Sequence, residues 1–86
     1  MQLFVTGVRQ KGVDRRTFTL NEFCKEDTVR TLKLVISNKF CIPYDIFYLV
    51  AGKHITKGTL KENNITNEQC IRVVFRAGGA RDIVMN

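Results

Sequence analysis

Residues 26–39 read EDTVRTLKLVISNK, and this stretch decides the fold because its apolar residues follow a helical period. They recur at spacings of three and four, which places them on one face of a helix: Val29, Leu32, Val35 and Ile36. The acidic and hydroxyl side chains of residues 26–28 suit a helix start. Pro43 prevents continuation at the other end. We therefore expect a helix over residues 28–39.

Strand patterns flank this helix on both sides. Period-two alternation or β-branched and aromatic character marks residues 1–6, 17–20, 47–50, 54–55 and 70–76. Residues 51–52 and 57–58 carry turn signals, and residues 59–64 fit a single helical turn. Because one helix interrupts a series of strands, one sheet packed on one helix is the economical architecture. We expect Phe18, Leu32, Ile36 and Val73 in its core.

Length and composition fit a single ordinary domain. The chain has 86 residues, of which 44% are hydrophobic and 26% charged. The longest apolar run, residues 46–51, is far shorter than the roughly 20 residues of a membrane span, and no secretory signal is visible. Three widely spaced cysteines and one histidine fit reduced thiols in the cytoplasm or nucleus. We expect no metal and no cofactor.

Basic residues gather in the connection formed by residues 8–16. Arg9, Lys11, Arg15 and Arg16 face only Asp14 there, within a net charge of +6 for the chain. Such a loop attracts nucleic acid or acidic partner surfaces. No aromatic residue stands among its charges, as a base-stacking platform would need. A solvated loop is therefore the favoured interpretation.

The C-terminal strand pattern leads into two glycines. Residues 70–76 are followed by Ala77, Gly78 and Gly79, and then by residues 80–86. Glycine has no side chain to block approach and adopts backbone angles closed to other residues. An extended Gly-Gly can therefore enter a narrow enzyme cleft. The alternative is a simple loop between strand and tail.

Segments along residues 1–79 resemble ubiquitin and its close relatives. They are Met1-Gln2-Leu3-Phe4-Val5, Thr17-Phe18-Thr19-Leu20, Asp27-Thr28-Val29, Ile42-Pro43, Ala51-Gly52-Lys53 and Phe75-Arg76. The resemblance implies an α+β protein with the β-grasp fold, in which a mixed sheet of about five strands packs on one helix. It divides the chain into a ubiquitin-like domain, residues 1–79, and a C-terminal extension, residues 80–86.

The same resemblance implies a protein modifier, not an enzyme. A processing protease would cut after Gly79, with Gly78 giving clearance, and activating and conjugating enzymes would join the Gly79 carboxylate to substrate lysines. Arg76 matches the arginine that helps the activating enzyme recognise ubiquitin. The first connection is longer than that of ubiquitin, and the tail is one residue shorter and lacks a second arginine. Both differences bear on recognition by the ordinary ubiquitin-activating enzyme.

Partner recognition is expected on an exposed apolar sheet patch of Phe47, Leu49, Arg72 and Val74. Ubiquitin-receptor-type proteins would bind there, and Tyr48 and Val50 would enter the core instead. Among the lysines, Lys53 matches the best-known linkage lysine of ubiquitin and Lys33 a minor one. A surface lysine is more often only a solubilising charge.

Two alternatives stay open beside a monomeric modifier, and catalysis is not one of them. A cysteine hydrolase needs a thiolate beside a histidine, and no cysteine here has a recognisable nucleophile context, which disfavours catalysis. A β-grasp sulfur carrier would turn the terminal Gly-Gly into a thiocarboxylate. A non-covalent ubiquitin-like domain would bind ubiquitin receptors and carry Gly-Gly by chance.

Overall fold

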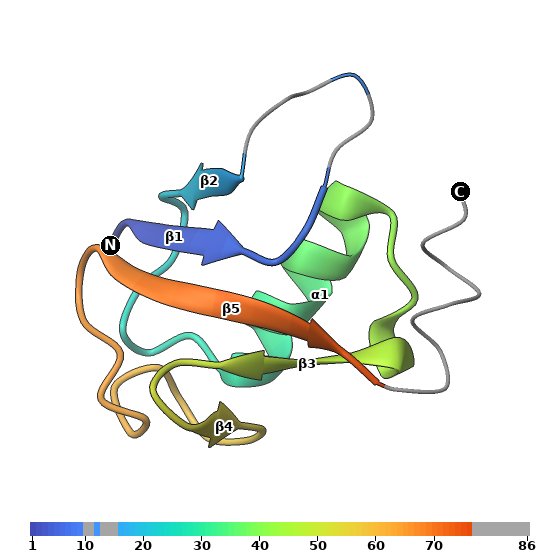
Figure 1. The fold of residues 1–86 in the computed structure, drawn as a ribbon. Helices are drawn as coiled ribbons and strands as arrows, with labels where there is room; N and C mark the ends of the chain where they lie inside the picture. Colours follow the sequence, from blue (N-terminus) through green and yellow to red (C-terminus); the bar gives the residue numbers. More distant parts are fainter. Residues whose placement is uncertain (10–11, 13–15, 77–86) are drawn as a thin grey trace.

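The computed structural model describes residues 1–9, 12 and 16–76 of the chain. These residues form a mixed sheet and one α-helix (Figure 1). The elements in chain order are β1 (Leu3–Thr6), β2 (Thr17–Leu20), α1 (Val29–Phe40), the 3₁₀ turn η1 (Tyr44–Ile46), β3 (Phe47–Val50), β4 (His54–Ile55) and β5 (Gln69–Phe75). The expected α+β class, with one helix inside a series of strands, is confirmed.

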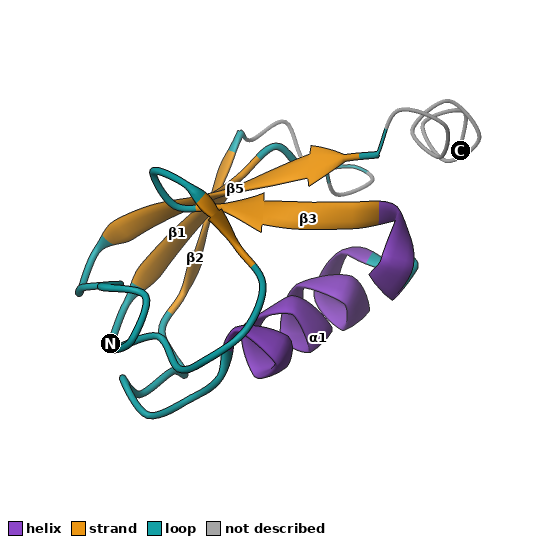
Figure 2. Ribbon diagram, turned by 90° about the horizontal axis from the view of Figure 1, so that it is seen from below, coloured by secondary structure: helices purple, strands orange, loops and turns teal. Residues whose placement is uncertain are grey.

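The five strands form one sheet in the order β2-β1-β5-β3-β4. Strands β1 and β2 pair as an antiparallel hairpin, and β3 pairs antiparallel with both β4 and β5. Strand β5 lies parallel to β1, so the chain must cross over between them, and α1 lies in that crossover. Figure 2 shows the helix against one face of the sheet.

Local side chains set both ends of α1. Thr28 is the N-cap, and its hydroxyl oxygen accepts a hydrogen bond from the backbone N–H of Thr31 at 3.1 Å. Cys41 ends the helix in the left-handed conformation, and its N–H donates to the carbonyl of Ser37. The apolar stripe faces the sheet through Val29, Leu32, Ile36 and Phe40. The helix bounds agree with the periodicity of the sequence.

The core fills the space between helix and sheet. Leu32 and Ile36 are fully buried, Phe18 is 3% exposed and Val73 is 4% exposed, so all four expected core residues are confirmed. Val8 is also buried, although it lies in the segment expected to be a solvated basic loop. Arg9 and Arg16 in the same segment are exposed. The first residue of that connection therefore belongs to the core.

Gly7 lets the chain leave β1 close to β5. Its φ of +85° lies in the left-handed region, and a Cβ there would collide with the carbonyl oxygen of Val73. A residue with a side chain would need both a strained backbone and a displaced neighbouring strand. Glycine is therefore required at this position.

Candidate functional site

The sheet face opposite α1 is the first part of the candidate site. Strand register aligns one residue from each strand in a row across it: Thr17, Thr6, Arg72, Val50 and His54. In Figure 2 the helix lies below the sheet, and no described element packs on the other side. Side chains on this face are therefore available to a partner.

Apolar side chains lie within this row and beside it. We define the outer patch as the half-buried Phe4, Tyr48, Val50 and Val74 together with the exposed Arg72 and His54. Tyr48 is directly opposite Val74, and its ring contacts the His54 ring with centroids 4.6 Å apart. Apolar surface bordered by charged and polar groups is a usual feature of protein-binding sites.

Two residues expected in the exposed patch belong to the core instead. Phe47 is fully buried and Leu49 is 1% exposed, so their expected exposure is wrong. Leu49 is opposite the buried Val73, and neighbouring residues of a strand point to opposite faces. Tyr48 and Val50 therefore lie on the outer face, and the expectation that they enter the core is also wrong. Arg72 and Val74 lie on the outer face as expected.

The sequence patterns did not predict four members of the outer patch: Phe4, Tyr48, Val50 and His54. Strand β3 offers little signal because Phe47–Val50 is apolar throughout, so its alternation is hidden. The Tyr48 hydroxyl is the one indication that this side chain lies on the outer face, since a phenol needs a polar partner or water. The partnership of Tyr48 with Val74 follows only from the register.

The end of β5 is the second part of the candidate site. Arg76 is exposed, and its backbone N–H donates to the carbonyl of Ile46 at 2.8 Å. This bond holds the chain against η1 one residue beyond the strand. Gly78 and Gly79, expected as the conjugation and processing residues, lie outside the described residues.

The two candidate linkage lysines have different surroundings. Lys53 is exposed in the turn between β3 and β4. Lys33 is half-buried on α1, with its Nζ 4.3 Å from the ring centroid of Tyr44 and 5.0 Å from that of Phe47. Burial lowers the pKa of Lys33 below its ordinary value, the charge of Arg76 lowers it further, and Asp45 opposes both. Lys33 is thus a positioned cation near the end of β5.

The cysteine thiols and the possible metal-binding side chains of the described residues do not form a cluster. Cys24, Cys41 and Cys70 are exposed free thiols, and no group of three His, Cys, Asp or Glu side chains in the described part of the chain could hold a metal ion. No described helix is long and apolar enough to cross a membrane.

The sequence matches no protein-family model, and no curated protein matches it significantly.

Proposed function

We propose that this chain is a ubiquitin-like protein modifier with the β-grasp fold. The observation that carries the proposal is the position of Arg76. This residue is exposed at the end of β5, an interior strand of the sheet, and is held by Ile46. Ala77, Gly78 and Gly79 follow directly in the sequence. A glycine pair attached to the end of such a strand is what an activating enzyme or processing protease needs to bind.

The chemistry is carried out by partner enzymes, with this protein as their substrate. Hydrolysis of the peptide bond after Gly79 would release residues 80–86 and free the Gly79 carboxylate. The carboxylate would attack ATP, giving an acyl adenylate and pyrophosphate. A cysteine thiol of the activating enzyme would displace AMP, and after transfer to a conjugating enzyme a substrate lysine amine would displace the thiol. The product is an isopeptide bond.

The outer patch supports recognition by ubiquitin-receptor-type proteins. Val50 and Val74, not Leu49, provide its apolar surface beside Arg72. We place the protein in the cytoplasm or nucleus as a monomer, with Lys53 as the more accessible linkage lysine. The outer patch also favours the second candidate, a non-covalent ubiquitin-like domain, because it is present whether or not the tail is cleaved.

Processing and conjugation provide the test. Full-length protein is incubated in an extract of its own cells, and its intact mass is measured. We expect loss of residues 80–86 in the native chain and none in a Gly79→Ala variant, which should fold equally well. A chain ending at Gly79 should form lysine-linked adducts only when ATP is present.

Two other outcomes would change the assignment. Persistence of the full-length protein together with an absence of adducts from the truncated chain would favour the non-covalent domain. A mass increase that corresponds to sulfur replacing oxygen at the Gly79 carboxylate would identify a sulfur carrier.

A further inference from the structure

A cleft lies at the end of the sheet where β1 and β5 begin. It has a volume of about 630 Å³ and is lined by Met1, Phe23, Cys24, Lys25, Glu26, Lys61, Asn64, Ile65, Thr66 and Asn67. This volume falls in the range of about 300–1,000 Å³ that is typical of ligand sites. None of these residues belongs to the outer patch or to the end of β5.

Backbone hydrogen bonds hold the two walls of the cleft together. The Lys61 N–H donates to the Lys25 carbonyl at 2.9 Å, and the Leu60 N–H donates to the Asp27 carbonyl at 2.8 Å. On the adjacent side, the side-chain oxygen of Asn67 accepts from the Gln2 N–H at 2.7 Å. These bonds bring residues 23–26 and 61–67, which are distant in sequence, into one site.

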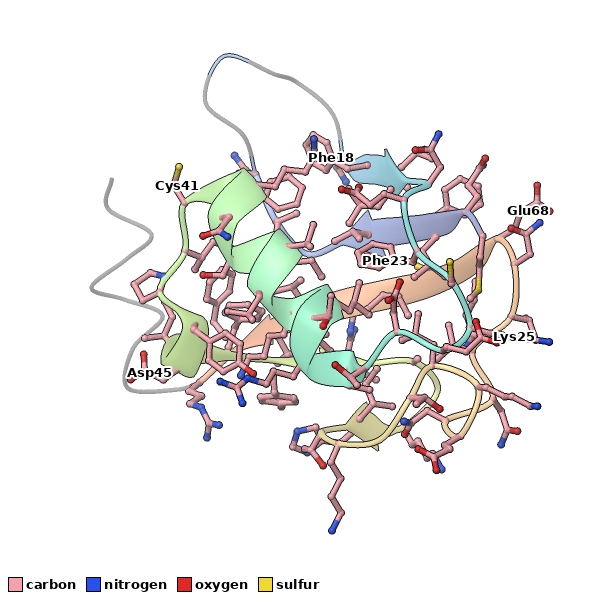
Figure 3. All side chains as sticks on the ribbon, turned by 180° about the vertical axis from the view of Figure 1, so that it is seen from behind. Phe18, Phe23, Lys25, Cys41, Asp45 and Glu68 are labelled. Carbon is pink, nitrogen blue, oxygen red and sulfur yellow. The ribbon has the colours of Figure 1, made fainter. Side chains whose placement is uncertain are left out.

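The cleft has an apolar floor and a mainly positive rim. Phe23 and Ile65 line it while belonging to the core, at 2% and 4% exposure. Lys25 and Lys61 are exposed on the rim, where Glu26 is the single carboxylate among the lining residues. Figure 3 shows Phe23 directed between helix and sheet and Lys25 at the periphery.

These features define the chemistry of an occupant. An apolar side chain would fill the cleft above the buried Phe23 and Ile65 and pack against the half-buried Met1. Carboxylates would be attracted by the two lysines, whose backbones are directly bonded. The amides of Asn64 and Asn67 and the hydroxyl of Thr66 supply groups for hydrogen bonds to a peptide backbone. An extended segment fits this open, partly polar cleft because it can place one side chain inward and others along the rim.

We propose that this cleft binds an acidic peptide segment of a partner protein, with one bulky apolar side chain over Phe23 and Ile65 and carboxylates beside Lys25 and Lys61. This binding is separate from the proposed conjugation, since it requires neither Gly78 nor Gly79. It would give the protein a second recognition surface at the opposite end of β5 from Arg76.

The test uses the full chain and a fluorescein-labelled peptide in which glutamates flank one leucine, with binding followed by anisotropy. We expect Lys25→Glu and Lys61→Glu each to weaken binding about threefold and the double variant about tenfold. The matched control is Lys39→Glu with Lys57→Glu, which changes the net charge equally at exposed lysines outside the cleft. Circular dichroism checks that every variant is folded.

Two further measurements locate the binding. Replacing the peptide's leucine by alanine should weaken binding about tenfold, because less apolar surface is buried. Amide shifts in nuclear magnetic resonance spectra should change at residues 23–26 and 61–67. The proposal is overturned if both double variants bind alike, or if the shifts change at Tyr48, Val50 and Val74 instead. Equal binding by N-acetyl-leucine alone would also overturn it in favour of a small-acid site.

Discussion

The charge state of Lys33 depends on the groups around its ammonium. Burial lowers its pKa below the ordinary value of 10.5, Arg76 lowers it further, and Asp45 opposes the shift. Arg76→Gln should therefore raise the Lys33 pKa, and Asp45→Asn should lower it. A titration that follows the Lys33 side-chain resonances by nuclear magnetic resonance measures both changes. Shifts in the opposite directions would contradict this assignment of causes.

The same shift predicts a dependence of stability on pH. Between the lowered pKa of folded Lys33 and about 10.5, the unfolded chain binds more protons at this site than the folded chain. The Lys33 contribution to the unfolding free energy therefore rises with pH across this window. Lys33→Met should remove that contribution, so the difference in unfolding free energy between the two proteins should change across this window, as denaturation at a series of pH values measures.

Gly7 and Gly52 separate the effect of backbone strain from that of a collision. Both have a φ near +80°, but a Cβ at Gly7 would meet the Val73 carbonyl, whereas nothing lies within 4 Å of one at Gly52. Gly52→Ala should cost about 1 kcal/mol of unfolding free energy, and Gly7→Ala should cost at least about 2 kcal/mol. Urea denaturation measures both. Equal losses would show that β5 can move aside.

At the scale of elements, α1 provides a matched pair of positions. Ile36 is fully buried against the sheet, and Leu34, on the same helix, is 42% exposed. Ile36→Ala should lower the unfolding free energy by about 2–5 kcal/mol, because it leaves a cavity in the core. Leu34→Ala should cost less than about 1 kcal/mol. If Ile36→Ala lowered the unfolding free energy by less than about 1 kcal/mol, the core would be able to close around the smaller side chain.

The predictability of an element depends on whether polar residues mark its outer face. Helix α1 was predicted correctly because Arg30 and Lys39 alternate with its apolar stripe. Strand β5 was predicted correctly because Arg72 separates the buried Ile71 and Val73. Strand β3 has no charged residue, and a shift of one residue in its alignment exchanges its two faces.

At the scale of the whole molecule, sites made by distant segments had no local signal. The outer patch depends on the register between β3, β4 and β5, and the cleft depends on the hydrogen bond from the Lys61 N–H to the Lys25 carbonyl. The periodicity of apolar residues along the sequence predicts neither the outer patch nor the cleft. Arg76 was different, because its place next to the glycine pair is itself a sequence feature, and the structure adds its exposure and its bond to Ile46.

The neighbouring residues Leu49 and Val50 test whether stability and recognition are assigned to the correct faces of the sheet. Leu49 is 1% exposed beneath the sheet, whereas Val50 is half-buried on the outer face. Leu49→Ala should therefore lower the unfolding free energy by about 2–5 kcal/mol. Val50→Ala should cost less than about 1 kcal/mol but weaken binding to a labelled ubiquitin-receptor domain.

Urea denaturation measures the effect of each substitution on stability, and anisotropy titration measures its effect on receptor binding. If Val50→Ala destabilised the fold as much as Leu49→Ala, the register of β3 would be wrong. If binding survived both Val50→Ala and Val74→Ala, receptors would not use the outer patch. Leu49 and Val50 are adjacent residues of β3, so their side chains project to opposite faces of the sheet. Opposite effects of the two substitutions on stability and binding would therefore arise from the pleat of the sheet.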